Sequence, residues 1–496
     1  MYNPSLKDFL KLSQKGNVIP VYKEINADLD TPVSAFLKMS KDGYAFLLES
    51  VEGQEKIARY SFLGSKPYLV FQAKAKFIQV SYLKNRTVDK YITKSHALDE
   101  IRKIMQGFRA VAVKGLPRFY GGLVGYIGYD MARFFEKIPD KNPDNLKLAD
   151  AVFILTDTMI IFDHVNHTMK ILSNVMLPQD NPRLSKSQKS RLYFEAIKKI
   201  ESIEQDLKKT FIKNQEIKTV KKSNLPVSSN VKRPQFLRMV NEAKRYIRAG
   251  DIIQVVLSQR FKVKIKQETF DIYRSLRQTN PSPYMYFLKL KDIFLIGSSP
   301  EMLVRCEDGI VQTRPIAGTR WRGRTEKEDL RLQNELLRDK KEKAEHIMLV
   351  DLGRNDLGRV CKKGSVEISE FMGVEKYSHV MHLVSEVRGI LDKKFDIYEL
   401  LRACFPAGTV TGSPKIRAME IIDEMENVRR GPYAGCVGYF SFSHNLDTCI
   451  TIRTIIGKGN TAYIQAGAGI VADSVPQREY NESVNKARAL IEAIVK

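Results

Sequence analysis

The spacing of apolar residues changes along the chain, and this change constrains the fold more than any other feature. Residues 17–175 contain short strand-like runs separated by turns, and a helical pattern at 95–108 interrupts them. In the C-terminal half, amphipathic helices alternate with apolar strands and glycine turns. A helix is expected at 235–249, with Gly250 at its C-terminal boundary, followed by a strand at 252–261. The pattern therefore predicts a mixed protein whose N-terminal and C-terminal regions pack as one body.

The segment between these two regions differs from both. A break rich in proline, asparagine and serine at 177–187 precedes a charged helical pattern at 188–209. Residues 208–233 then carry eight basic residues and one acidic residue. We divide the chain into an N-terminal region at 17–175, a charged helix and linker at 176–230, and a larger C-terminal region at 231–496.

The formal net charge of +24 on 496 residues raises nucleic-acid binding as one class of function. The basic residues are dispersed, however, and their densest stretch lacks the interleaved aromatic side chains that stack on bases. A solvated linker is the better interpretation of that stretch. We therefore expect no nucleic-acid partner. The charge excess by itself identifies neither an acidic metabolite nor an acidic protein as a ligand.

The N-terminus and the cysteines indicate a cytoplasmic protein without membrane association. The first residues contain no basic region followed by an apolar stretch, and no later apolar run is long enough to cross a bilayer. The five cysteines are widely spaced and match neither a CxxC pair nor a zinc site with histidine. We expect reduced thiols that are mostly buried. Cys436 has glycines nearby, but we expect a core residue there rather than a nucleophile.

Two segments place carboxylates at helical spacing. Glu342 and Glu345 are three residues apart, as are Glu479 and Glu482, and Lys486 follows four residues later. Such glutamates usually face solvent, and the spacing alone leaves that interpretation open. Two carboxylate faces from distant segments could instead meet at Mg²⁺, which needs only one or two protein carboxylates besides waters and substrate oxygens.

Glycine turns and arginines offer donors for an anion. Gly318 stands in an expected loop, with Arg314 and Arg320 close by for charge-assisted contacts. A tight turn without any ligand explains the glycine equally well. Arg453 lies inside an apolar strand pattern at 449–456, where a buried guanidinium needs a partner. A bound carboxylate would satisfy it.

Longer tracts are more specific than these general patterns. In combination they resemble the chorismate-utilising enzymes, and within that family the large subunits of anthranilate synthase. The resemblance covers residues 17–175 and 230–496. It implies an α+β fold of the anthranilate synthase type, with antiparallel sheets packed between helical layers and two interwoven subdomains. The tracts are 315–320, 344–356, 379–385 and 406–415.

The resemblance also implies a set of site residues. Glu345 and Glu482 match positions that hold Mg²⁺, the cofactor that neutralises the ring carboxylate of chorismate. Glu301 matches the catalytic acid that protonates the leaving C4 hydroxyl, so a raised pKa is expected. His382 matches the catalytic histidine, and His379 is close enough in sequence to compete for that role. The substrate-binding positions are Gly318, Thr319, Tyr433, Arg453, Gly467, Ala468 and Gly469.

Two positions narrow the reaction. Relatives that add water to chorismate carry a lysine at the position of Gln254, and a glutamine cannot be that general base. Relatives that make aminodeoxychorismate for the folate pathway often carry a nucleophilic lysine at the position of Ala317. The resemblance therefore implies that ammonia attacks ring carbon C2 and that pyruvate is eliminated to leave anthranilate, the first step of tryptophan biosynthesis. Aminodeoxychorismate synthesis is the alternative.

The N-terminal region carries a regulatory marker. Segments at 47–50, 59–61 and 280–285 resemble the tryptophan feedback site of the family. Each segment alone would be an ordinary strand or turn. Together they imply that tryptophan inhibits the protein by favouring an inactive arrangement of the two regions. The positions that match ligand contacts are Ser50, Pro283, Tyr284 and Met285.

No cysteine context or additional domain for glutamine hydrolysis is recognisable in the sequence. The resemblance therefore implies a separate glutamine amidotransferase subunit that supplies ammonia, and thus a hetero-oligomer. In these terms the region 17–175 carries the tryptophan site and the region 231–496 is the chorismate-binding catalytic part.

Overall fold

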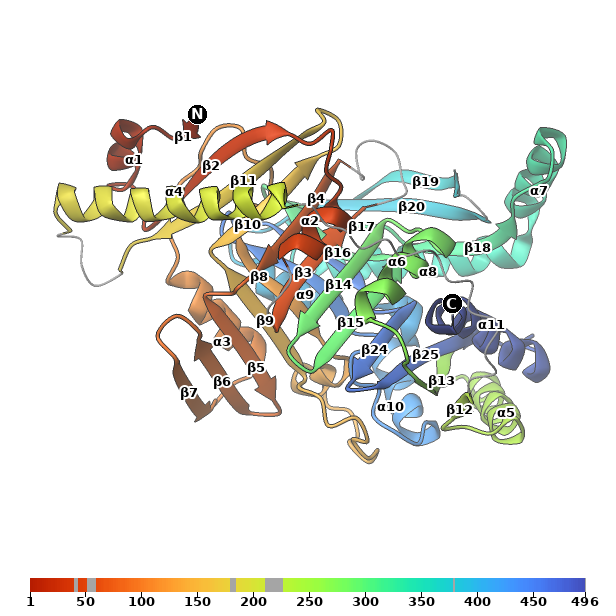
Figure 1. Ribbon diagram of the computed structural model, residues 1–496. Coiled ribbons are helices and arrows are strands. Elements are labelled where there is room, and N and C mark those ends of the chain that lie inside the picture. Colours follow the sequence, from red (N-terminus) through yellow and green to blue (C-terminus); the bar gives the residue numbers. More distant parts are fainter. Residues whose placement is uncertain (40–42, 51–58, 179–183, 210–225, 378–379, 496) are drawn as a thin grey trace.

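The computed structural model describes residues 1–39, 43–50, 59–178, 184–209, 226–377 and 380–495. These residues form two large β-sheets surrounded by helices (Figure 1). None of the helices in these ranges is long and apolar enough to span a bilayer. The helices are α1 (Leu6–Leu12), α2 (Pro32–Met39), α3 (Ala97–Gln106), η1 (Tyr129–Phe134), α4 (Lys186–Lys208), α5 (Arg233–Ala249), α6 (Thr269–Thr279), α7 (Glu326–Arg338), α8 (Lys340–Gly358), α9 (Ile397–Cys404), η2 (Gly408–Val410), α10 (Lys415–Met425) and α11 (Pro476–Val495).

The first sheet combines strands from both ends of the chain. Its order is β1-β2-β11-β10-β4-β3-β14-β15-β24-β25-β13-β12, and β21 also pairs with β13. Strand β3 pairs antiparallel with β14, so Glu49 lies opposite Met285. The strands are β1 (Tyr2–Asn3), β2 (Val18–Asn26), β3 (Tyr44–Glu49), β4 (Tyr60–Ser65), β10 (Thr158–Asp163), β11 (Thr168–Met176), β12 (Ser228–Ser229), β13 (Gln254–Lys264), β14 (Tyr284–Leu290), β15 (Ile293–Ser299), β21 (Gly412–Ser413), β24 (Thr454–Lys458) and β25 (Thr461–Ile470).

The second sheet is built in the same way. Its order is β18-β20-β17-β16-β23-β22-β8-β9-β5-β6-β7, and β19 also pairs with β20. Strands β22 and β8 join the two regions of the chain, with Val437 opposite Tyr126. The strands are β5 (Leu69–Lys74), β6 (Phe77–Tyr82), β7 (Thr87–Ile92), β8 (Gly122–Ile127), β9 (Ala151–Thr156), β16 (Met302–Glu307), β17 (Ile310–Thr313), β18 (Ile316–Trp321), β19 (Glu367–Lys376), β20 (Val380–Ile390), β22 (Cys436–Ser441) and β23 (Leu446–Ile450).

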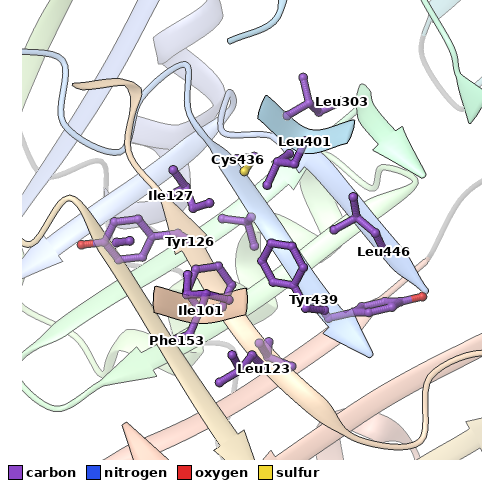
Figure 2. Packing of buried hydrophobic residues seen from close by; sticks show 14 of the residues in the cluster. Ile101, Leu123, Tyr126, Ile127, Phe153, Leu303, Leu401, Cys436, Tyr439 and Leu446 are labelled. Carbon is purple, nitrogen blue, oxygen red and sulfur yellow. The ribbon is translucent and has the colours of Figure 1, made fainter. Parts of the chain in front are cut away.

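The apolar cores show how the layers stack. The largest core takes buried residues from both sheets and from α3 and α9. Figure 2 shows part of it, in which Ile101 of α3, Phe153 of β9, Leu401 of α9 and Tyr439 of β22 belong to one cluster. A second core lies between the first sheet and α1, α2, α4, α6 and α11. Burial of these apolar faces is the main stabilising contribution to such a fold. The expected α+β fold, with antiparallel sheets between helical layers, is confirmed.

Several local predictions also hold. Helix α5 has a proline in its first turn and ends at Gly250, which adopts a left-handed φ of 84°. Helix α4 occupies nearly the whole of the charged segment expected at 188–209, and a capping box at Ser185 starts it. The most basic part of the linker, 210–225, lies outside the described residues.

The cysteines behave as core residues. All five are free and buried. Burial raises the pKa of the Cys436 thiol to about 12, so a reactive thiolate is disfavoured there. The interpretation of Cys436 as a core residue is confirmed.

Candidate active site

Strand β18 contains the tract that was expected to be a loop. Ile316–Trp321 pairs with β20, and the register shifts between Ala317 and Thr319, which places a β-bulge at Gly318. Gly318 has a φ of 66°, and an added Cβ would lie 3.2 Å from a carboxylate oxygen of Glu342. The expected loop is therefore a strand whose bulge requires glycine.

Strand β20 brings His382 against this bulge. His382 is the register partner of Thr319, and its Nδ1 lies 3.0 Å from the Gly318 carbonyl oxygen and 3.1 Å from the Thr319 hydroxyl. Because a carbonyl oxygen only accepts, Nδ1 carries the ring proton and Nε2 is the acceptor. Burial lowers the pKa of His382, and the charge of Arg453 acts in the same direction. The imidazole is therefore neutral at pH 7. His379 lies outside the described residues.

The two arginines that flank the tract are already paired with protein carboxylates. Arg320 donates to Asp339 at 2.8 Å and contacts Glu342 at 3.4 Å. Arg314 forms an ion pair with Glu375. These contacts pair both guanidinium groups with carboxylates of the protein, which makes them less available to a bound anion than an unpaired arginine.

Arg453 differs from these two arginines. It lies in the turn between β23 and β24 with a φ of 50°, so the strand expected at 449–456 is interrupted at this residue. Burial lowers the pKa of Arg453. In the described part of the chain its guanidinium makes neither a hydrogen bond nor an ion pair. A partly buried cation without a protein partner is suited to bind a carboxylate.

Glu301 lies in the buried turn between β15 and β16. The Ile450 N–H donates to the Glu301 carbonyl at 3.0 Å, and Ser299 Oγ donates to the Ile450 carbonyl at 2.7 Å. Burial raises the pKa of the Glu301 carboxyl to about 8, against smaller opposing effects of Thr409 and Lys486. The raised pKa that the resemblance implies is thus present. The carboxyl is mainly protonated at pH 7 and can donate its proton.

The carboxylates of α8 and α11 approach one another. Gln254 Nε2 donates to Glu345 Oε1 at 3.1 Å. Burial raises the pKa of Glu345, and the charges of Glu342 and Glu482 raise it further. Glu482 is about half exposed and bonds Lys486 at 2.7 Å. A cation between these helices would relieve the repulsion between the carboxylates.

This donor set fits Mg²⁺. Glu345 and Glu482 would supply oxygen ligands from two helices, and the hydrogen bond from Gln254 would orient Glu345. Among the residues that the structure describes, no group of three or more His, Cys, Asp and Glu side chains surrounds a common position. Mg²⁺ does not need such a group, because it retains waters and takes oxygens from its substrate.

The glycine-rich segment expected at the end of a strand lies within β25. Gly467, Ala468 and Gly469 pair with β13. The Gly467 carbonyl accepts a hydrogen bond from Lys486 Nζ at 3.1 Å, and an added Cβ at Gly469 would lie 2.8 Å from Gln254 Nε2. Small residues here therefore allow Gln254 to reach Glu345.

Tyr433 is buried beside a guanidinium. The Arg430 guanidinium lies 5.4 Å from the Tyr433 ring centre and 4.8 Å from that of Tyr129. Arg430 also donates to the carbonyls of Val256 and Val410, both at 2.7 Å. One buried side chain thus connects β13, η2 and Tyr433.

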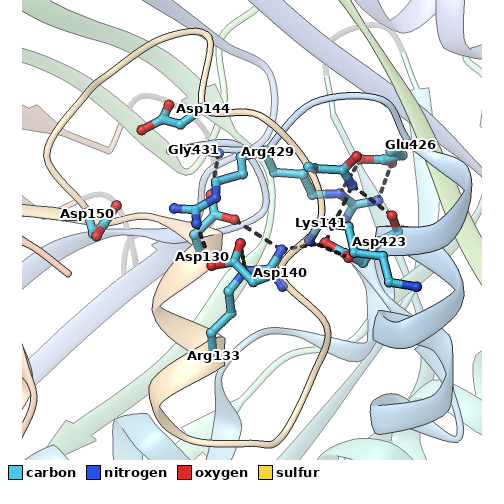
Figure 3. A network of polar contacts seen from close by, with 12 residues as sticks. Asp130, Arg133, Asp140, Lys141, Asp144, Asp150, Asp423, Glu426, Arg429 and Gly431 are labelled. Atoms are coloured by element: carbon cyan, nitrogen blue, oxygen red, sulfur yellow. Dashed lines mark hydrogen bonds and ion pairs between the residues drawn. The ribbon is translucent and has the colours of Figure 1, made fainter.

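A polar network holds the segment that precedes Tyr433 (Figure 3). Asp130 accepts a hydrogen bond from the Gly431 N–H at 2.8 Å. Arg133 donates to Asp423 at 2.7 Å, and Arg429 forms an ion pair with Asp140. Asp130 thus attaches the segment to η1, the Arg429 ion pair attaches it to the loop at Asp140, and Arg133 joins η1 to α10.

A second pocket lies where β3, β14 and β23 meet. It is lined by the residues expected to contact an amino-acid inhibitor, namely Ser50, Pro283, Tyr284 and Met285. Tyr284 donates to Asp447 at 3.0 Å. The Ser50 hydroxyl is buried and has no hydrogen-bond partner within the described ranges. Pairing of β3 with β14 explains why segments so distant in sequence share one pocket.

Three groups without an assigned role also lie at the first site. Lys486 contacts Glu482, and Glu479 is buried with its pKa raised by that burial. The Thr409 hydroxyl lies near the Glu301 carboxyl, but it is buried without a partner in hydrogen-bond geometry. The helical spacing of Glu479, Glu482 and Lys486 is the signal in the sequence that indicates Glu479 and Lys486.

Comparison with known proteins agrees with this geometry. The family model for chorismate binding enzymes matches residues 44–492. Anthranilate synthase component 1 of Acetivibrio thermocellus is 47% identical over 100% of this chain and 99% of its own length, and that of Aquifex aeolicus is 47% identical over 99% and 98%. The crystal structure of anthranilate synthase component I from Streptococcus pneumoniae matches with a TM-score of 0.76 at 36% identity, covering 94% of this chain and 98% of that one. The chain therefore belongs to the chorismate binding enzymes, within their anthranilate synthase component 1 group.

Proposed function

We propose that the protein converts chorismate and ammonia to anthranilate and pyruvate with Mg²⁺ as cofactor. One observation carries this proposal. Glu482 acts electrostatically on both Arg453 and Glu345, and its ion-pair partner Lys486 acts on the buried acid Glu301. A cation and a pair of metal-binding carboxylates suit the two carboxylates of the substrate, and a protonated acid suits its departing hydroxyl group.

Each step of the reaction has a residue suited to it. Arg453 and backbone groups near Gly318 and Gly467 bind the substrate carboxylates. The nitrogen of ammonia forms a bond to ring C2 while the two ring double bonds shift and the C4–O bond breaks. Glu301 gives its proton to the leaving hydroxyl, which departs as water, and the new ammonium group releases one proton. Loss of the C2 proton then breaks the C3–O bond, expels the enol of pyruvate and leaves an aromatic ring. The neutral His382 keeps the Gly318 bulge in place through Nδ1.

The cofactor would be held by Glu345 and Glu482. When bound, Mg²⁺ would neutralise the negative charge of a ring carboxylate. The hydrogen bond from Gln254 fixes one oxygen of Glu345, so that its other oxygen can face the ion.

Two side chains favour this reaction over its relatives. Ala317 is buried in β18 and offers no nucleophile, which disfavours aminodeoxychorismate synthesis through a covalent lysine adduct. Gln254 cannot act as a general base for water, and its amide is occupied by Glu345. Direct amination at C2 is the reaction that remains.

Purified protein incubated with chorismate, Mg²⁺ and ammonium at pH 7.5 is expected to release anthranilate and pyruvate in equal amounts. Anthranilate can be followed by its fluorescence and pyruvate by a coupled dehydrogenase. Replacement of Mg²⁺ by a chelator is the control and should stop both. Accumulation of aminodeoxychorismate without anthranilate would contradict the proposal and support the folate-pathway alternative.

We also propose that the second pocket binds tryptophan and that tryptophan inhibits the reaction. The pocket supports this because Met285 and Pro283 offer apolar contacts while the unpartnered Ser50 hydroxyl offers a polar one. Ser50→Phe fills part of the pocket and removes the hydroxyl, and it is expected to raise the tryptophan concentration for half-inhibition at least about ten-fold, as expected when a buried polar contact is lost. Calorimetric titration with tryptophan measures the loss directly. Unchanged inhibition would remove Ser50 from the site.

The source of ammonia is proposed to be a second protein. The component 1 names of the relatives imply a second component. We propose that this partner is a glutamine amidotransferase subunit and that the two form a hetero-oligomer in the cytoplasm. The free, buried cysteines agree with a reducing compartment.

A further inference from the structure

The turn that carries Arg453 adopts a backbone conformation that only its surroundings can maintain. Arg453 has a φ of 50°, in the left-handed region that disfavours residues other than glycine. The turn has no glycine of its own, because its neighbours are Ile452 and Thr454. Hydrogen bonds from outside the turn must therefore hold it. Two such connections exist, and both begin at the wall of the second pocket.

The first connection runs through a tyrosine hydroxyl. Thr454 Oγ1 donates to the Ile452 carbonyl at 2.8 Å and closes the turn. Since the threonine hydroxyl has only one proton, it accepts from Tyr286, whose hydroxyl lies 2.6 Å away. Tyr286 lines the second pocket. Its ring covers Gly297, where an added Cβ would lie 2.0 Å from the ring.

The second connection runs through a buried serine. The Ser298 N–H donates to the Arg453 carbonyl at 3.1 Å. Ser298 Oγ lies 2.9 Å from Ser282 Oγ and accepts from Asn280 Nδ2 at 2.9 Å. Ser282 immediately precedes Pro283 of the second pocket. The carbonyl of Arg453 is thus two hydrogen-bonding steps from the pocket wall.

Both connections are shielded from water. Tyr286 is 2% exposed, Ser298 is 0% exposed and Thr454 is 4% exposed. Buried hydrogen bonds cannot be exchanged for bonds to water, so a shift of Tyr286 or Ser282 must be followed by the turn or leave polar groups unpaired. The turn therefore has two distinct arrangements, one with these hydrogen bonds made and one with them broken, as a two-state coupling element requires.

We propose that Thr454 and Ser298 are positioning residues that hold Arg453 in its substrate-binding conformation, and that they couple occupancy of the second pocket to Arg453. This inference rests on the proposed binding of chorismate at Arg453 and of tryptophan in the second pocket. An indole side chain that displaces Tyr286 or the Ser282–Pro283 segment pulls on the turn and moves the guanidinium. Because coupling is reciprocal, chorismate weakens tryptophan binding by the same factor by which tryptophan weakens chorismate binding.

A matched pair of variants at one position tests the positioning role. Thr454→Val keeps the shape of the side chain and removes the hydroxyl, whereas Thr454→Ser keeps the hydroxyl. Thr454→Val is expected to raise the KM for chorismate about three- to ten-fold with kcat changed less than about three-fold, because Arg453 contributes to binding rather than to proton transfer. Thr454→Ser should restore the KM. Equal KM values in the two variants would overturn the positioning role.

The coupling is measured without turnover. Tryptophan is titrated calorimetrically into protein with Mg²⁺, with and without saturating chorismate, and with ammonium omitted. The ratio of the two Kd values is expected to exceed about five in the parent and to be clearly smaller in Thr454→Val and in Ser298→Ala, each of which breaks one of the two connections. Tyr193→Phe is the control, because it removes a buried hydroxyl that donates to the Pro4 carbonyl at 2.9 Å, remote in sequence from both sites. Its ratio should equal that of the parent.

The outcomes separate the inference from the function on which it rests. If tryptophan does not bind the parent, the proposed inhibitor site fails and the coupling fails with it. If tryptophan binds the parent and both variants with the same ratio, the coupling alone is wrong. Melting curves identify any variant that does not fold, and the Thr454 pair remains decisive if Ser298→Ala is lost in this way.

Discussion

Glu301→Gln is expected to lower kcat about 10²- to 10⁴-fold while chorismate binding changes little. The carboxyl is buried and mainly protonated at pH 7, so the amide keeps the size and the neutral charge of the acid but has no proton to give. The departing hydroxyl must then leave without protonation. Steady-state kinetics with anthranilate fluorescence measure the loss, and calorimetric titration with chorismate measures binding.

The pH dependence follows from the pKa of about 8 for Glu301. The protonated form is the active one, so activity should fall as pH rises through about 8. The same ionisation affects stability, because a folded pKa above the ordinary 4.5 means that the folded state loses stability as pH rises from about 5 through 8. Glu301→Gln lacks this loss and should become more stable than the parent at pH 8.5, measured as a higher melting temperature.

Asp308→Asn is the matched control. It also changes a carboxyl to an amide, and Asp308 directly follows β16 whereas Glu301 directly precedes it. Its activity, its pH profile and its melting temperature should match those of the parent. A Glu301→Gln enzyme with normal kcat would show that another group protonates the leaving hydroxyl.

Glu482→Ala is expected to reduce Mg²⁺-dependent turnover about a thousand-fold, because several kcal/mol of carboxylate neutralisation are lost with the ion. Glu345→Gln should have a similar effect. Both variants should fold, since Glu482 is about half exposed and Glu345 forms one polar contact in the described residues, with Gln254. Activity measured over a range of Mg²⁺ concentrations separates weaker ion binding from slower chemistry.

A second glutamate on α11 provides the control. Glu492 is exposed and lies near the end of the same helix, so Glu492→Ala should retain the activity and the Mg²⁺ dependence of the parent. Direct titration with Mg²⁺ in the presence of chorismate and without ammonium gives a readout that does not depend on turnover. Normal Mg²⁺ affinity in Glu482→Ala would remove this residue from the metal site.

Local elements were predictable where a single segment contains its own signals. Gly250 ends α5 in the left-handed conformation expected of it, and Ser185 caps the charged helix α4. The strand in the tract at 315–320 was not predictable in this way, because its β-bulge depends on the partner strand β20 as well as on Gly318. The break at Arg453 is similar: the apolar pattern continues through 449–456, but contacts from β14 and β15 impose the turn.

The candidate site shows the same division. The resemblance identified Glu301, His382 and the carboxylates by position, and their roles stay predictions. In the structure Arg453 acts electrostatically on His382, and Glu482 acts on both Arg453 and Glu345. The spacing of Glu479, Glu482 and Lys486 was visible, but spacing alone does not show which of these side chains leave the solvent. Thr409 lies within the tract at 406–415, but the sequence does not show that its hydroxyl is buried beside Glu301. The structure does, and this makes Thr409 a candidate site residue.

The sequence by itself determined the mixture of helices and strands, the family and the positions of the candidate residues. The tertiary structure decided which charges are available to a ligand. Arg314 and Arg320 are neutralised by carboxylates, whereas Arg453 makes no such pair among the described residues. Desolvation and Coulomb energies depend on distances between segments far apart in the chain, so local sequence does not encode them. The raised pKa of Glu301 has the same origin, because burial by β15, β16 and their neighbours produces it.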